Sequence, residues 1–129
     1  MPRSILDEAH IHPAIRAIVA GHQADIVREV QAALAANAVV IVGMAQNPFP
    51  KKARKLLDAA GVAYKYIEYG SYFSDWRRRN ALKMWSGWPT FPMVFVKGML
   101  VGGADDLDRL IKSGELKQML GDGPGGAGR

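Results

Sequence analysis

The residues Asn47-Pro48-Phe49-Pro50 stand between an aliphatic run at 39–42 and a segment of helical periodicity at 51–61. The aliphatic run predicts a buried strand, and the following segment predicts a helix that ends at Gly61. The first N–H groups of a helix lack intrahelical partners, so ligands and reactive groups collect at such a junction. The chain contains no cysteine. A thiol nucleophile, a disulfide and a zinc–thiolate site are therefore excluded at this corner and elsewhere.

Two further segments have residue types that suit binding. Trp88-Pro89-Thr90-Phe91-Pro92 is expected to be extended and rigid, because each proline biases its predecessor toward β conformations. Gly102-Gly103-Ala104-Asp105-Asp106 opens a predicted helix with carboxylates near its positive end. Basic residues gather at 51–55 and 77–79 in a chain of net charge +5. They suit small anions or a solvated face, whereas the aromatic and glycine pattern of RNA-binding segments is missing, so nucleic acid is not an expected partner.

The elements that must position these segments follow from periodicity and turn residues. We expect a central strand at 38–43, a helix ending at Gly61, and a strand at 62–68 that lies parallel to the first by the right-handed crossover rule. A helix containing Trp85 precedes a β-hairpin that turns at Lys97-Gly98. The order predicts an α/β fold with a four-stranded mixed sheet and helices on both faces.

The chain of 129 residues is long enough for one domain. We expect an N-terminal helical extension at 1–24, a domain at 25–120 and a disordered glycine-rich tail at 121–129. The first residues lack the apolar run of a signal peptide, and no stretch reaches the ~18–20 apolar residues of a membrane span. These features predict a cytoplasmic protein without a membrane partner.

The layout resembles the thioredoxin fold, and residues 26–120 resemble a glutaredoxin of the monothiol branch. Three segments support the resemblance: the strand and helix around Asn47-Pro48-Phe49-Pro50, the segment Trp88-Pro89-Thr90-Phe91-Pro92, and Gly102-Gly103-Ala104-Asp105. In the family the first reads Cys-Pro-Tyr-Cys or Cys-Gly-Phe-Ser, the second contains Thr-X-Pro, and the third is close to Gly-Gly-Cys-Asp.

The resemblance implies a groove for glutathione. Pro92 would be cis, which leaves the Phe91 backbone to pair with an extended peptide. Arg79 would hold the ligand's glycine carboxylate, Asp105 would meet its free amino group, and Thr90 would contact it. Plainer roles stay open: a solvated helix face for Arg79, a helix cap for Asp105 and a rigid connector for residues 88–92.

The same alignment shows which redox residues the chain lacks. Asn47 occupies the position of the nucleophilic cysteine, and Pro50 occupies that of the second cysteine or serine. Ala104 replaces a distal cysteine, and Met44 replaces a lysine that lowers the cysteine pKa. An amide cannot become a thiolate, so attack by this chain in thiol–disulfide exchange is excluded.

Monothiol relatives bind an iron–sulfur cluster through the cysteine that Asn47 replaces, so we expect no cluster here. His10, His12 and His22 are weighed as metal ligands, but no third ligand accompanies His10-Ile11-His12, and surface or packing roles are favoured. No catalytic residue and no metal ligand is therefore predicted.

Three functions remain open. The first is a non-catalytic module that binds glutathione or an extended peptide. The second is a transferase-like enzyme in which Asn47 steadies the thiolate of bound glutathione. The third is a structural protein whose segment 1–24 mediates oligomerisation.

Overall fold

The computed structural model describes residues 3–71 and 74–121. The chain begins with a short 3₁₀ helix, η1. The elements then run α1 (Pro13–Gly21), α2 (Ala24–Ala36), β1 (Val39–Gly43), α3 (Pro48–Ala59), β2 (Lys65–Glu68), α4 (Trp76–Ser86), β3 (Met93–Val96), β4 (Met99–Gly102), α5 (Ala104–Ser113) and α6 (Glu115–Gly121).

The sheet has four strands in the order β2-β1-β3-β4. Strand β1 pairs in parallel with β2, with Val40 opposite Lys65, and antiparallel with β3, with Val40 opposite Phe95. Strands β3 and β4 form an antiparallel pair. The predicted mixed sheet is confirmed, and its central strand is buried at all five residues because helices cover both of its faces.

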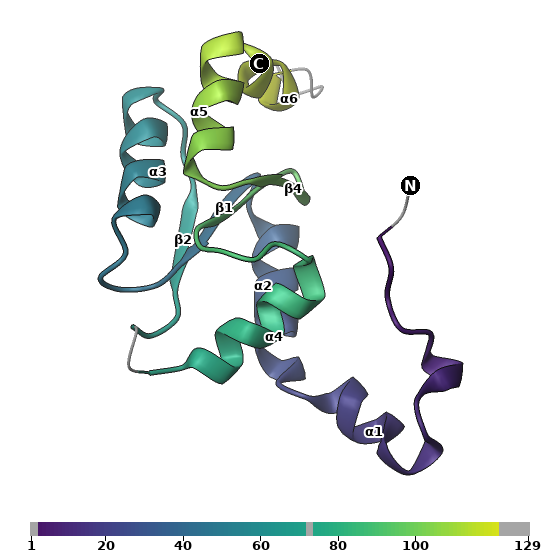
Figure 1. Ribbon diagram of the computed structural model, residues 1–129. Helices are drawn as coiled ribbons and strands as arrows, with labels where there is room; N and C mark the ends of the chain where they lie inside the picture. The colour runs from purple at the N-terminus through teal and green to yellow at the C-terminus, as the bar shows by residue number, and fades with distance from the viewer. Residues whose placement is uncertain (1–2, 72–73, 122–129) are drawn as a thin grey trace.

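Side chains that alternate along β1 enter two different cores. Val40 and Val42 pack in one cluster with residues of α2 and α4, including Ile26 and Leu82. The intervening residues pack in a second cluster with α3, α5 and α6: Val39, Ile41, Ala53, Leu57, Leu107 and Leu116. The molecule therefore has three layers, with α2 and α4 on one face of the sheet and α3, α5 and α6 on the other (Figure 1).

The hairpin prediction is confirmed in detail, because Lys97 and Gly98 both have positive φ, at 51° and 80°. The predicted start of the second strand at Val62 is too early. The Val62 N–H donates to the Leu57 carbonyl at 3.0 Å, and Gly61 has φ of 72°. These are the features of a Schellman motif, which carries the chain past the helix end before it becomes a strand at Lys65.

The predicted N-terminal helical extension is present as η1 (Glu8–His10) and α1, and neither contains a buried residue. It runs away from the sheet (Figure 1) and exposes apolar side chains such as Ile5, at 69%, and Ile18, at 67%. Residues 122–129 of the predicted tail lie outside the described residues, whereas Gly121 ends α6. In the part of the chain that the structure describes, no helix has both the length and the apolar character needed to cross a membrane.

A candidate ligand groove without a thiol

Asn47 is the N-cap of α3 and links that helix to a distant loop. Its Oδ1 accepts the Phe49 N–H at 3.0 Å, which satisfies one of the free donors of the first turn. Its Nδ2 donates a longer hydrogen bond of 3.4 Å to the Phe91 carbonyl. The Asn47 side chain, at the position of the family's nucleophilic cysteine, therefore caps the helix and contacts the loop that contains Phe91.

The other redox positions, directly after β1 and on α3 and α5, also hold packed side chains. Met44 is only 7% exposed and belongs to the core between the sheet, α2 and α4. Pro50 is buried against β1, and a Cβ added to Gly43 would stand 2.8 Å from the Pro50 Cβ. Ala104 is 4% exposed in the opposite core. Packed side chains fill these positions, and burying an ionised side chain there would cost free energy.

The loop before β3 forms the facing wall. The Phe91-Pro92 peptide bond is cis, as the family resemblance predicts. Phe91 is 5% exposed, Pro92 is buried, and Thr90 is exposed at the entrance to the loop. The Phe91 carbonyl points at Asn47, so the backbone of this loop lies beside the N-terminus of α3.

The start of α5 is shaped by two glycines and a carboxylate. Gly102 has φ of 119°, and a Cβ there would lie 2.4 Å from Asp106 Oδ2, so only glycine fits. Gly103 is the N-cap, and its N–H donates to Asp106 at 2.9 Å. Asp106, rather than Asp105, therefore reaches back to the cap. This leaves the Asp105 carboxylate exposed at the start of α5.

Asp105 is paired with Lys52, whose Nζ lies 2.8 Å from Asp105 Oδ1. The pair joins the N-terminal halves of α3 and α5, and its side chains are 46% and 68% exposed. The hydrogen bond and the charge of Lys52 hold the pKa of Asp105 below its ordinary value, and Asp105 raises the pKa of Lys52 in return. Both groups are therefore charged at neutral pH.

Arg79 is placed differently from what a ligand-binding role suggests. It is the one charged residue among the described buried side chains, at 6% exposure. Its Nη1 donates to the Tyr69 carbonyl at 3.0 Å and to the Ser74 carbonyl at 2.5 Å. Arg79 thus fixes the chain on either side of the segment after β2, and its contact with a ligand carboxylate stays a prediction.

Lys83 is the cation that the sequence reasoning overlooked. It lies on α4 one turn after Arg79, and its Nζ stands 5.8 Å from the centre of the Phe91 ring. That distance is within the range of a cation–π interaction. The signal in the sequence was the i, i+4 spacing, which places both residues on one helix face.

A network between α2 and α4 supports the position of Arg79. The Tyr69 hydroxyl donates to the Glu29 carboxylate, and burial followed by this hydrogen bond raises the pKa of Tyr69. Arg78 lies 5.3 Å from the centre of the Tyr69 ring and 3.6 Å from an oxygen of Asp25. The end of β2 is therefore tied to both helices on its face.

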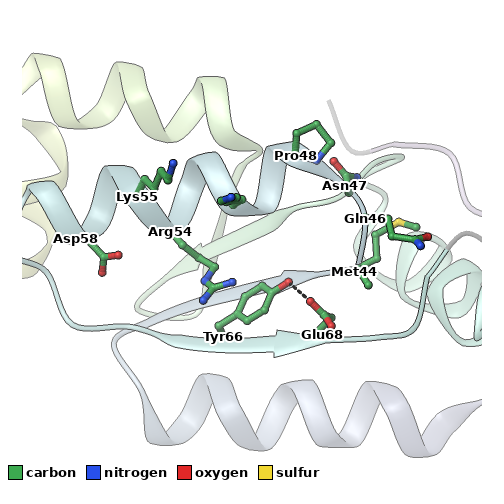
Figure 2. A pocket seen from close by; sticks show the side chains of 11 residues that line it. Met44, Gln46, Asn47, Pro48, Arg54, Lys55, Asp58, Tyr66 and Glu68 are labelled. Carbon is green, nitrogen blue, oxygen red and sulfur yellow. Dashed lines mark hydrogen bonds between the residues drawn. The ribbon is translucent and has the colours of Figure 1, made fainter.

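An open cavity of about 550 Å³ lies beside the corner, between α3 and the edge strand β2 (Figure 2). The Arg54 guanidinium stands 4.4 Å above the Tyr66 ring. The Tyr66 hydroxyl donates to Glu68 at 2.9 Å, and burial, followed by that bond, raises the Tyr66 pKa to about 12. The phenol is therefore neutral and held in place at physiological pH.

The three histidines are placed apart from this groove, on the N-terminal segment. His12 caps α1, because its Nδ1 accepts the Ala14 N–H at 3.0 Å. Within residues 3–71 and 74–121, no three His, Asp or Glu side chains converge as metal ligands would.

Sequence and structure comparisons place the chain among known proteins. The Glutaredoxin family model matches residues 39–101. A "Glutaredoxin-like protein" of Dictyostelium discoideum is 47% identical over 95 residues, which cover 74% of this chain and 77% of that protein. This chain belongs to the glutaredoxin family.

Two further comparisons refine its place among the glutaredoxins. The Legionella pneumophila protein described as "Probable monothiol glutaredoxin GrlA" is 37% identical over 79 residues, which cover 61% of this chain and 85% of that protein. A crystal structure of a buckwheat glutaredoxin–glutathione complex superposes with a TM-score of 0.67, at 24% identity, over 79% of this chain and 93% of the buckwheat chain. The thioredoxin-type fold is thus shared, while this glutaredoxin lacks cysteine altogether.

The structure brings most of the predicted groove residues together. Asn47 contacts Phe91, and Asp105 is linked through Lys52 to the same helix that Asn47 caps. Arg79 is itself buried, and it contacts the carbonyl of Tyr69, the residue that follows β2. Lys52, which links α3 to Asp105, belongs to the basic cluster at 51–55, whereas Lys83 lies outside both basic clusters of the sequence.

Proposed function

We propose that this glutaredoxin-like protein binds glutathione or an extended peptide non-covalently, without thiol–disulfide chemistry of its own. The observation that supports this most is the position of the Phe91-Pro92 loop beside the N-terminus of α3. The main chain of such a loop can pair with an extended ligand as a strand would, independently of any cysteine.

Charged groups at the two ends of the groove suit a ligand with opposite charges at its ends. The Asp105 carboxylate is exposed at one rim and suits an ammonium group. Lys83 stands beside Phe91 and suits a carboxylate, a role in which the buried Arg79 would be the alternative. The buckwheat glutaredoxin of the same fold was crystallised with glutathione, which gives the ligand class a precedent.

The proposal is tested by following backbone amide signals by NMR while glutathione is added. We expect saturable shifts at Phe91 and Asp105, and weaker binding in Asp105→Asn. Asp108→Asn, which makes the same change on the same helix, is the control and should bind like the wild type. The absence of shifts at millimolar glutathione, together with no response to a peptide, would refute the binding role.

A further inference from the structure

The rim of the proposed groove contains an ion pair that a ligand must meet. Lys52 on α3 and Asp105 on α5 are 53 residues apart in the sequence, and their charged atoms lie 2.8 Å apart. The Lys52 ammonium is thus already bound to the carboxylate that, in the proposed function, would bind the ammonium of a ligand. The protein therefore provides its own ammonium group, that of Lys52, as a partner for Asp105.

A second contact from the same helix has the same character. The Asn47 amide donates to the Phe91 carbonyl, which is the kind of bond that a peptide N–H of an extended ligand would make. This bond is long, at 3.4 Å, and is the weaker of the two contacts. The chain near the start of α3 thus supplies an amide N–H and an ammonium, the two kinds of donor that a tripeptide with a free amine carries.

We propose that Lys52 is a specificity-determining residue that directs the groove toward extended peptide segments without a free amine, in preference to glutathione. This inference rests on the proposed function of the groove. A ligand ammonium at Asp105 would stand beside the Lys52 ammonium, and two like charges at short range repel. A neutral amide at the same point meets no such repulsion, so the discrimination comes from an unfavourable contact built against one ligand.

The expected discrimination is modest and depends on salt. Both side chains are about half exposed or more, so the interaction of their charges is weakened by water. We expect a change in Kd of about two- to fivefold, the range of exposed charge pairs. It should shrink as salt increases, because the Debye length falls from ~10 Å at 0.1 M to ~3 Å at 1 M.

The test measures the Kd of glutathione and of N-acetylglutathione, in which the amine is blocked, for the wild type and for Lys52→Met. The variant should bind glutathione about two- to fivefold more tightly and N-acetylglutathione without change. Lys55→Met is the matched control, since it removes the same charge from an exposed position three residues along α3. It should change the ratio of the two Kd values little.

A second readout does not depend on ligand binding. Lys52 lowers the pKa of Asp105, so the carboxyl pKa measured by NMR should rise in Lys52→Met and stay near its wild-type value in Lys55→Met. An unchanged Asp105 pKa in Lys52→Met would overturn the inference, because the ion pair would then be absent in solution.

The outcomes separate this inference from the proposed function. Equal changes in the Kd of both ligands in Lys52→Met would overturn the role in specificity and leave the groove as a binding site. If neither ligand binds the wild type or any variant, the proposed function itself fails, and the inference fails with it.

Discussion

The two walls of the groove differ in what determines their shape. On the α3 wall the side chains at Met44, Asn47 and Pro50 are packed, capping or buried, and none can ionise. On the facing wall the shape comes from the main chain, through the Phe91-Pro92 loop and the glycines before α5. The difference teaches that reactive positions can hold inert side chains while the Phe91-Pro92 loop and the start of α5 keep their main-chain conformation, because the two depend on different atoms.

The largest expected effect concerns the buried Arg79, which donates to two main-chain carbonyls after β2. Arg79→Met would leave the carbonyls of Tyr69 and Ser74 without their donor, and hydrogen bonds to charged groups are worth about 1.5–3 kcal/mol each. We expect the free energy of unfolding, measured by urea titration, to fall by about 2–4 kcal/mol. Arg77→Met on the exposed side of α4 should cost less than ~1 kcal/mol. If Arg79→Met kept full stability and weakened only ligand binding, Arg79 would belong to the groove surface instead.

The next largest effect is expected at Asn47, because its side chain bonds both to the first turn of α3 and to the Phe91 carbonyl. Asn47→Ala removes the cap of α3 and should lower stability by ~1 kcal/mol. Asn47→Asp keeps an oxygen for the Phe49 N–H and loses only the donor to Phe91, so thermal unfolding should show a smaller loss. Equal stability of Asn47→Ala and the wild type would mean that the corner does not depend on this side chain. In that case only a role toward a ligand thiolate would remain for it.

The Arg54–Tyr66–Glu68 group beside the α3 wall predicts a dependence on alkaline pH. Burial raises the Tyr66 pKa from 10.0 to about 12 in the folded chain. The folded state therefore holds the phenol proton more tightly than the unfolded state does. The contribution of the protonated Tyr66 phenol to the free energy of unfolding is intact below pH 10 and is lost as pH rises toward 12. Urea midpoints of the wild type should fall more steeply over this range than those of Tyr66→Phe, and parallel curves would contradict the assignment.

The smallest effect is expected from the N-terminal segment. Its helices bury no residue, so deleting residues 1–22 should change the free energy of unfolding by less than ~1 kcal/mol. Sedimentation of both proteins gives the second measurement. A loss of several kcal/mol, or a change of oligomeric state, would show that residues 1–22 belong to the stable assembly and would support the structural function considered from the sequence.

Local signals in the sequence predicted the outline of the site. The aliphatic run of β1, the Lys97-Gly98 turn and the segment ending at Pro92 each specify their own conformation, so their elements were predictable. The partner of Asp105 was not, because an exposed lysine on another helix gives no local sign of its contact. The burial of Arg79 was not predicted for a similar reason. Helical spacing does not distinguish a charged residue that faces solvent from one that donates to main-chain carbonyls in the interior.

The most direct measurement of the central claim is an NMR titration with S-methylglutathione, in which the thiol is blocked, beside one with glutathione. The account predicts that both ligands bind with similar Kd and shift the same signals, around Phe91 and Asp105, because the groove uses the ligand's main chain and charges. Binding that requires the free thiol, or shifts that avoid the Phe91-Pro92 loop and the start of α5, would contradict it.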